Sequence, residues 1–217
     1  MASKALLLFL LLIALVCNPT FAFDNSPLQD FCVADITGQV RVNGFPCKDP
    51  KEVQADDFFF AGLHLPTNTS NPFGLGSNIL TASQLPGLNT LGISLARVDF
   101  APLGVSSPHI HPRATEVVTI LEGTLEMGFV TSLPDNRLIS KVLNKGDVFV
   151  VPPGLIHYAR NPGKSNTAGI VAFSSQSPGF LLIPQAVFGS NHNISSDILA
   201  KSFQVDENVI SQIRAKF

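Results

Sequence analysis

Short apolar runs separated by turn residues dominate the middle of the chain, from about residue 90 to residue 175. Several runs alternate between apolar and polar positions, which is the two-residue period of a β-strand. Clusters such as Pro134-Asp135-Asn136 and Pro152-Pro153-Gly154 interrupt them. Strands are therefore expected at Leu91–Phe100, Glu116–Leu121, Thr124–Thr131, Leu138–Leu143, Asp147–Val151, His157–Asn161 and Gly169–Ser174.

Strands at this spacing favour an all-β antiparallel sandwich or barrel, because no run in this region is long and helical enough for βαβ units. The preceding residues 61–90 are rich in turn-forming residues and are expected to be loop with short extended pieces. One further strand is expected near the N-terminus, at Ile36–Val42, followed by a turn at Asn43-Gly44.

The C-terminal tail has a helical period instead. Val205, Val209, Ile213 and Phe217 recur every four residues, so they would form one face of an amphipathic helix. A shorter helix is expected before it, near Asp197–Phe203. Helices outside a barrel need a surface to cover, which either an oligomer interface or their own barrel would supply.

Residues 1–22 have the pattern of a secretory signal peptide. Lys4 supplies the positive charge, Ala5 to Val16 is an unbroken apolar run, and Ala22 is a small residue at the expected cleavage site. A run of this length is too short to cross roughly 30 Å of hydrocarbon as a helix. We therefore expect a secreted chain without a membrane anchor.

The compartment also decides the cysteine chemistry. Cys17 would leave with the signal peptide, and Cys32 and Cys47 would then form a disulfide in an oxidising environment. Sequons at Asn68 and Asn193 fit a secreted glycoprotein. The formal net charge of −2 and the charged content of 14% give no reason to expect nucleic acid or an anionic membrane as a partner.

Three histidines and one glutamate have a spacing that suggests a shared metal ion. His109 and His111 are two residues apart, which on a strand places both imidazoles on one face. Pro112 is expected to break that strand, so the chain can turn and bring Glu116 inward on the next one. His157 follows a rigid Pro-Pro-Gly turn that fixes its direction. This set suits a redox-capable divalent cation, and iron, nickel, zinc or copper would also be accepted.

Both segments resemble the paired motifs of the germin family, within the cupin superfamily. The first, G-x5-HxH-x4-E-x6-G, matches at His109, His111, Glu116 and Gly123, and Leu103 replaces its opening glycine. The second, G-x5-PxG-x2-H-x3-N, matches at Gly146, Pro152, Gly154, His157 and Asn161. Segments 29–35 and 97–102 resemble further hallmarks of the family, so the resemblance covers about residues 25–217.

The resemblance implies a single-domain cupin jelly-roll β-barrel with short C-terminal helices. It implies one manganese ion per subunit, held by His109, His111, Glu116 and His157. It further implies a glycosylated homo-oligomer, a hexamer built as a trimer of dimers, secreted to the plant cell wall and carrying the Cys32–Cys47 disulfide. The expected divisions are a signal peptide at 1–22, an arm at 23–60, the barrel at 61–195 and the helices at 196–217.

The resemblance leaves more than one function open. Oxalate-oxidising germins place asparagines at two substrate-contacting positions, which correspond to Ala96 and Ser106 here. Alanine cannot replace an amide donor and serine is shorter, so oxalate oxidation is not expected. A manganese superoxide dismutase with a role in defence or stress is favoured, and the alternative is a non-enzymatic cell-wall protein or a binder of small auxin-like ligands. His64 and His192 lie in loop-like sequence and are expected to be solvated bystanders.

Overall fold

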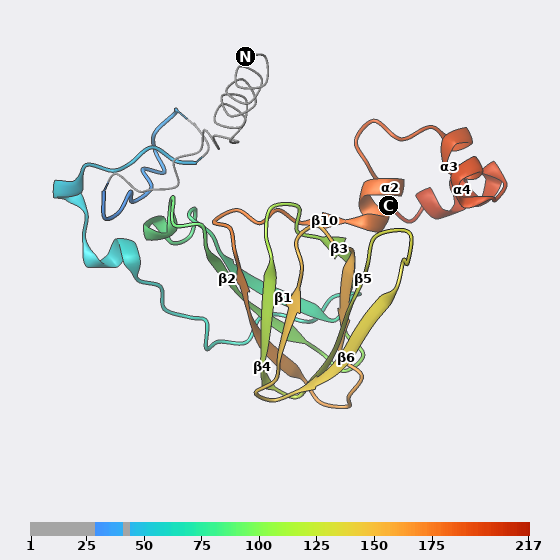
Figure 1. Ribbon diagram of the computed structural model, residues 1–217, viewed down its shortest axis with the longest axis horizontal. Helices are drawn as coiled ribbons and strands as arrows, with labels where there is room; N and C mark the ends of the chain where they lie inside the picture. The colour runs from blue at the N-terminus through green and yellow to red at the C-terminus, as the bar shows by residue number, and fades with distance from the viewer. Residues whose placement is uncertain (1–28, 41–43) are drawn as a thin grey trace, which may run out of the picture. The chain divides into compact units, whose positions relative to one another are not determined.

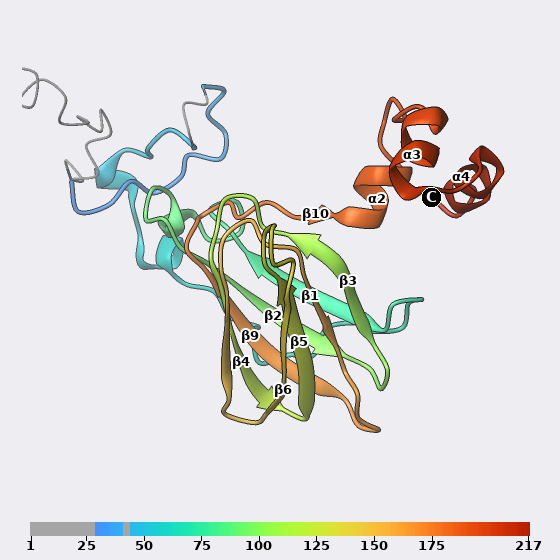
Figure 2. The same ribbon diagram turned by 45° about the vertical axis from the view of Figure 1, so that its right-hand side comes forward.

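In the residues that this computed structural model describes, 29–40 and 44–217, ten β-strands form two antiparallel sheets that close into a barrel (Figures 1 and 2). The predicted signal peptide lies outside the described residues. The sheet orders are β1-β2-β9-β4-β7 and β10-β3-β8-β5-β6. The strands are β1 (Leu75–Leu80), β2 (Ser94–Phe100), β3 (Val105–Ile110), β4 (Glu116–Glu122), β5 (Thr124–Val130), β6 (Leu138–Asn144), β7 (Val148–Val151), β8 (His157–Arg160), β9 (Thr167–Phe173) and β10 (Leu181–Leu182).

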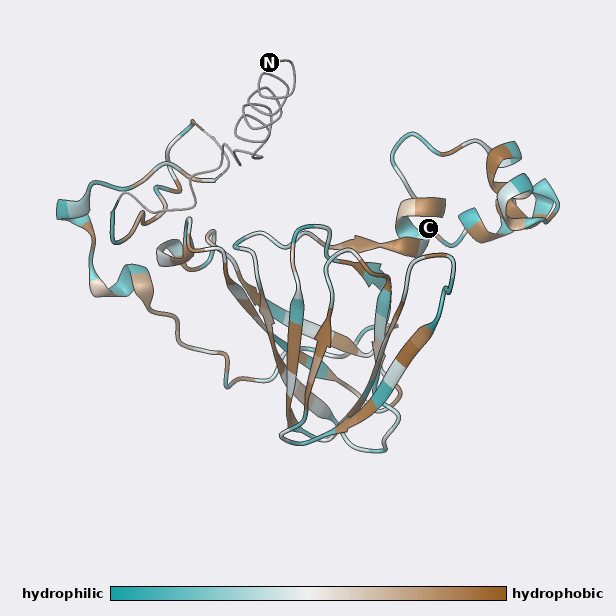
Figure 3. Cartoon of the chain, viewed as in Figure 1, coloured by the Kyte–Doolittle hydropathy of each residue, from teal (hydrophilic) through white to brown (hydrophobic). Residues whose placement is uncertain are grey.

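Alternate strand residues face the interior of the barrel, as the period-two pattern requires. On β4, Val118 and Ile120 are buried, whereas Val117, the residue before Val118, is 37% exposed. Hydrophobic residues lie along the strands of both sheets (Figure 3). The buried core draws on both sheets and consists of Ala96, Phe100, Ala114, Val118, Ile120, Leu125, Met127, Leu143, Val151, Ala159, Val171 and Phe173. The expected all-β barrel with short C-terminal helices is confirmed.

The strand expected at Ile36–Val42 is wrong in its described part, residues 36–40. Ile36 and Thr37 form a turn instead. The Asp35 carboxylate accepts hydrogen bonds from the backbone N–H of Thr37 at 2.9 Å and of Gly38 at 3.1 Å. A side chain that captures nearby backbone donors in this way competes with strand pairing, so a local turn replaces the strand.

The N-terminal part of the described chain is tied together by the expected disulfide. Cys32 and Cys47 are bonded, with their Cα atoms 4.9 Å apart. Beside this bond, Ala34 and Cys47 form an isolated antiparallel bridge. Two short 3₁₀ helices follow, η1 (Pro50–Glu52) and η2 (Ala55–Phe58). The segment 61–90, expected to be loop with extended pieces, contains β1 and the 3₁₀ helix η3 (Pro86–Leu88).

Three helices follow the last strand: α2 (Ile183–Phe188), α3 (Ser196–Phe203) and α4 (Glu207–Arg214). α3 and α4 confirm the two expected helices, whereas α2 was not expected. The fully buried residue of α4 is Ile210, which lies outside the predicted apolar stripe, while Val209 in that stripe is 39% exposed. Among the described residues, no helix has the length and apolar character needed to span a membrane. The divisions at residues 60, 61, 195 and 196 stay predictions.

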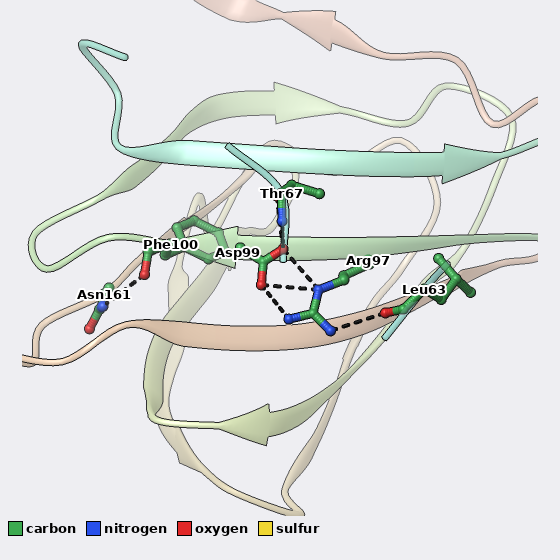
Figure 4. A network of polar contacts seen from close by, with 6 residues as sticks. All are labelled: Leu63, Thr67, Arg97, Asp99, Phe100 and Asn161. Atoms are coloured by element: carbon green, nitrogen blue, oxygen red, sulfur yellow. Dashed lines mark hydrogen bonds and ion pairs between the residues drawn. The ribbon is translucent and has the colours of Figure 1, made fainter. Parts of the chain in front are cut away.

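A buried ion pair fastens the segment 63–67 to the outer face of β2 (Figure 4). Arg97 donates from Nε and Nη2 to the carboxylate of Asp99, with a shortest contact of 2.6 Å. Its Nη1 donates to the Leu63 carbonyl oxygen at 3.0 Å. The Asp99 carboxylate also accepts from the backbone N–H and the hydroxyl of Thr67, each at 2.8 Å. This network gives the family hallmark at residues 97–102 a structural role.

Asn161, the last residue of the second motif, is a structural residue that joins its own loop, 161–165, to the end of β2. It is 1% exposed. Its Nδ2 donates to the carbonyl oxygens of Ala101 at 3.0 Å and Ser165 at 2.7 Å, and its Oδ1 accepts from the Gly163 N–H at 2.9 Å. Figure 4 shows it beside Phe100. The motif therefore combines a candidate ligand, His157, with a side chain that satisfies buried backbone groups.

Leu103, which replaces the opening glycine of the first motif, has φ 61° and a side chain that is 77% exposed. A side chain in this left-handed region costs about 1–2 kcal/mol, whereas glycine adopts it freely but loses more chain entropy on folding. We therefore expect Leu103→Gly to stabilise the fold by about 0.5–1 kcal/mol in denaturant unfolding. Leu91→Gly is the control, because Leu91 is an exposed loop leucine without positive φ. A Leu103→Gly protein less stable than wild type would contradict this expectation.

Candidate metal centre

The four candidate ligands come from both sheets and converge at one place in the barrel. His109 lies near the end of β3 and is paired in register with His157, the first residue of β8. Glu116 is the first residue of β4, in the other sheet. His111 lies just after β3, so the strand ends one residue before it and Pro112 begins the turn. The expected turn and inward return of Glu116 are both present.

One potential ligand atom from each of these four residues lies within 4.8 Å of all the others. The three imidazoles are close together, with ring centroids 4.1 Å apart for His109 and His157 and 5.2 Å apart for His109 and His111. All four residues are between 2% and 7% exposed. Among the described residues, this is the group of histidine, cysteine and acidic side chains that could hold a metal ion.

Backbone carbonyl oxygens fix the orientation and the tautomer of each imidazole. Nδ1 of His109 donates to the Ser107 oxygen at 2.8 Å, Nδ1 of His157 to the Leu155 oxygen at 2.9 Å, and Nδ1 of His111 to the Gly179 oxygen at 2.5 Å. A carbonyl oxygen can only accept, so each Nδ1 carries its hydrogen. Each Nε2 is then left with a free lone pair, which is the form that binds a metal.

The buried contacts of Glu116 fit a cation. Its Oε2 lies 3.0 Å from Nε2 of His157 and 3.2 Å from Nε2 of His111. The Oε2 atom and the His157 Nε2 atom are both buried without a hydrogen-bond partner. Because the ring hydrogens are on Nδ1, each contact places a lone pair of a histidine Nε2 against a lone pair of the Glu116 carboxylate. Buried polar atoms without a hydrogen-bond partner destabilise the fold. A cation among them would convert the repulsion into coordination.

The protonation states also favour metal binding. Burial, and then the charge on His157, lower the pKa of His109 to about 4. Burial would raise the pKa of Glu116, but His111 and His157, when their rings are protonated and donate from Nε2, outweigh burial and lower it to about 2. Near neutral pH, His109 is therefore neutral and Glu116 is ionised, which are the states that ligation requires.

The loop at 174–180 supports the centre from outside. Arg113 holds this loop, because its backbone N–H donates to the Pro178 oxygen and its Nε donates to the Ser177 oxygen at 2.8 Å. Gly179, which orients His111 through its carbonyl oxygen, has φ 72°. A Cβ atom there would lie 3.0 Å from both Pro112 and Arg113. Glycine therefore serves both the backbone conformation and the close approach.

A cavity of about 210 Å³ adjoins the four residues inside the barrel. Ala96 and Ser106, the positions that the family resemblance matched to substrate-contacting asparagines, both line it. They are 2% and 8% exposed, and the Ser106 hydroxyl lies 3.4 Å from Nδ1 of His109. The structure therefore brings both positions beside the candidate metal centre.

Several cavity residues were not found from the sequence. Phe173 and Phe180 pack on the cluster, with ring centroids 4.6 Å from His111 and 4.7 Å from His109, respectively. Phe180 lies in a loop without periodicity, so no local signal pointed to it. His64 and His192 are exposed and lie outside the four-residue group, as expected.

Comparison with known proteins agrees with this geometry. The cupin family model matches residues 61–211. Germin-like protein 8-2 of Oryza sativa subsp. japonica is 58% identical over 218 residues, covering 100% of this chain and 99% of the relative. Putative germin-like protein 2-2 of the same plant is 56% identical over 207 residues, covering 95% of this chain and 93% of the relative.

A solved structure of oxalate oxidase has the same fold. It is 44% identical, superposes with a TM-score of 0.85, and the match covers 88% of this chain and 96% of that one. The family model, the full-length relatives and the shared barrel agree with the two motifs around the four clustered residues. The chain therefore belongs to the cupin family and, within it, to the germin-like proteins.

Proposed function

We propose that the chain is a secreted manganese-binding protein that dismutates superoxide, and that His109, His111, Glu116 and His157 are its metal ligands. The observation that carries the proposal is the set of convergent donor atoms whose imidazole tautomers are fixed for ligation. Three imidazoles and a carboxylate suit a redox-active divalent ion. When bound, manganese would supply one-electron chemistry by alternating between its divalent and trivalent states.

The residues around the centre would orient the metal ligands and restrict water around them. Carbonyl oxygens of Ser107, Leu155 and Gly179 hold the three imidazoles in one tautomer, so no ring has to turn when the ion enters. Phe173 and Phe180 pack against these rings and restrict water around them. Superoxide is diatomic, so it needs no array of polar side chains in the cavity.

Oxalate oxidation, the activity named for the 44% identical oxalate oxidase, is not the function we propose. A small dianion needs hydrogen-bond donors for its carboxylate oxygens, and losing one such bond typically costs about 1–3 kcal/mol. Ala96 offers none, and the Ser106 hydroxyl faces His109. Peroxide release from the purified protein on addition of oxalate would contradict this conclusion.

The test compares superoxide consumption by the manganese-loaded wild type, the metal-free wild type and His109→Ala. We expect catalysed consumption by the first, with a loss of at least 100-fold in the other two. His64→Ala is the matched control, because His64 is an exposed histidine outside the cluster. Equal activity in the wild type and in His109→Ala would end the proposal.

We further propose secretion to the plant cell wall, a role in defence or stress, glycosylation and a hexameric assembly. The Cys32–Cys47 bond supports an oxidising compartment. Asn68 and Asn193 are both exposed, as glycan attachment requires. Exposed apolar side chains on the C-terminal helices, such as Ile198 at 54%, support burial between subunits. Mass spectrometry of the secreted protein would measure occupancy of both sequons and the size of the assembly.

A further inference from the structure

Met127 places an oxidisable sulfur in the wall of the cavity beside the four-residue cluster. The sequence contains two methionines, and the other one, Met1, belongs to the predicted signal peptide. Met127 lies on β5, lines the cavity and is 2% exposed. Oxidants convert a methionine thioether to a sulfoxide. The thioether that remains after removal of the signal peptide therefore lies in the cavity of the candidate metal centre.

The strand register places Met127 close to one of the candidate ligands. In the antiparallel pair of β5 and β8, Met127 is opposite Ala159 and Phe129 is opposite His157. Met127 is thus the diagonal neighbour of His157, and both residues line the cavity. Diagonal neighbours on one face of such a pair lie roughly 7–8 Å apart, within reach of long side chains. The unbranched methionine side chain has three rotatable bonds, so its sulfur can approach the cluster.

The cavity can admit a small oxidant. Phe180 and Ile79 both line it, and they are 53% and 42% exposed, so the cavity reaches the surface. Hydrogen peroxide is small and uncharged, so it needs no charged side chain to enter an apolar cavity. Dismutation of superoxide would also form peroxide at the centre itself. Peroxide can therefore reach Met127 from outside the protein or from the proposed reaction.

A cation held by the cluster would assist the oxidation of this thioether. A bound metal ion acts as a Lewis acid and polarises an oxygen atom that contacts it. The Met127 sulfur would attack one oxygen of the peroxide, so an S–O bond forms and the O–O bond breaks. The second oxygen leaves as water with both protons. Sulfur loses the two electrons that the peroxide gains, so the step needs no further oxidant.

We propose that Met127 is a modification site at which hydrogen peroxide, assisted by a metal ion among the four clustered residues, forms methionine sulfoxide. The inference rests on the metal-binding part of the proposed function and not on dismutation. The sulfoxide replaces an apolar side chain with a polar one. Its oxygen would face an apolar wall that includes Leu125 and Val171. Oxidation at this position therefore damages the wall of the cavity next to the centre.

The test uses the variant Leu133→Met, which adds an exposed methionine as an internal reference. Leu133 is 81% exposed and is absent from the cavity wall. The metal-free and the manganese-loaded full-length proteins are treated with dilute hydrogen peroxide, and peptide mass spectrometry follows the gain of one oxygen at each methionine.

We expect manganese to accelerate oxidation of Met127 at least tenfold and to leave the rate of the introduced methionine within twofold. A diffusible oxidant would accelerate both methionines, and local opening of the metal-free fold would make Met127 faster without the metal. Equal Met127 rates with and without manganese, a faster rate in the metal-free protein, or equal acceleration of both methionines overturns the proposal.

Metal content and superoxide consumption, measured on the same samples, separate this inference from the proposed function. A protein that binds manganese and dismutates superoxide without faster oxidation of Met127 overturns the inference and leaves the function standing. A protein that binds manganese and accelerates oxidation of Met127 without dismutation does the reverse. A protein that takes up no metal overturns both.

Met127→Leu tests the consequence of the modification. Exchange of methionine for leucine conserves volume and is usually tolerated in a core. Peroxide treatment is expected to lower the denaturant midpoint of the manganese-loaded wild type, because the sulfoxide adds a polar group to the apolar wall. The midpoint of Met127→Leu is expected to stay unchanged under the same treatment. An equal fall in both proteins shows that another group is the target and overturns this consequence.

Discussion

Glu116→Gln is expected to weaken manganese binding by at least 100-fold and, at the same time, to stabilise the metal-free protein. The carboxylate is the anionic member of the four-residue cluster, so glutamine removes its charge and leaves a neutral amide oxygen, which is a weaker ligand. Changing even a group that merely supports a ligand commonly costs about 10–100-fold in metal affinity. Competition titration against a chelator of known affinity measures the loss.

The metal-free protein should become more stable because the substitution removes the opposed lone pairs of Glu116 and His157. Oε2 of Glu116 lies 3.0 Å from the unpartnered Nε2 of His157. A glutamine amide placed there would donate a hydrogen bond to that nitrogen in place of the opposed lone pairs. Because an unsatisfied buried polar atom costs about 1–3 kcal/mol, we expect the metal-free variant to gain about 1 kcal/mol in denaturant unfolding.

Glu126→Gln is the matched control for both measurements. Glu126 lies on β5 and accepts from the Tyr158 hydroxyl at 2.9 Å and from Nε of Arg160 at 2.8 Å. The same chemical change there should leave manganese affinity unchanged and should not stabilise the metal-free fold. If Glu116→Gln retains wild-type affinity, or destabilises the metal-free protein as much as Glu126→Gln does, the lone-pair interpretation is wrong.

The sequence predicted the barrel because its strands are amphipathic, and a period of two is visible without any tertiary information. It also predicted the cluster from local rules. His109 lies on a strand, Pro112 breaks that strand, and Glu116 begins the next strand facing inward, all within eight residues. Such local rules failed where one side chain decided the conformation. Asp35 captures two backbone donors and turns a strand-like apolar segment into a loop.

Features that depend on contacts between distant segments were not predictable from spacing. The Gly179 carbonyl reaches His111 across 68 residues of sequence, and Arg97 reaches the Leu63 carbonyl across 34. The apolar stripe on the last helix illustrates a second limit. Periodicity identified a helix, but the residue that becomes fully buried is Ile210, because packing against neighbouring elements and not periodicity alone selects the buried face.

Asp99→Ala is expected to destabilise the fold by about 3–5 kcal/mol, which is the usual cost of leaving one member of a buried ion pair alone. Arg97 is 7% exposed, and its guanidinium would lose the carboxylate that accepts from its Nε and Nη2. Both donors of Thr67 would also lose their acceptor, so the segment 63–67 would be released from β2. Denaturant unfolding measures the loss, and limited proteolysis near residue 65 reports the release.

Two variants distinguish this mechanism from a general effect of removing charge. Arg160→Ala breaks the pair with Glu126, but the Arg160 side chain is 56% exposed, so a loss of about 0–1 kcal/mol is expected. The double variant Arg97→Met/Asp99→Leu removes both buried charges and should recover most of the stability lost in Asp99→Ala. A double variant as unstable as Asp99→Ala would show that the unpaired charge is not the cause.

The Arg97–Asp99 pair should make the free energy of unfolding depend on pH in the acid range. Burial raises the pKa of Asp99, but the hydrogen bonds from Arg97 and Thr67 outweigh burial and hold it below its ordinary value of about 3.9. A carboxyl group with a lowered folded pKa contributes fully above its unfolded pKa, and the contribution is lost as the pH falls through the folded value. The unfolding free energy of the wild type should therefore fall more steeply below about pH 4 than that of Arg97→Met/Asp99→Leu. Parallel profiles for the two proteins between pH 6 and pH 3 would remove Asp99 as a source of acid sensitivity, since the other carboxyl groups are common to both.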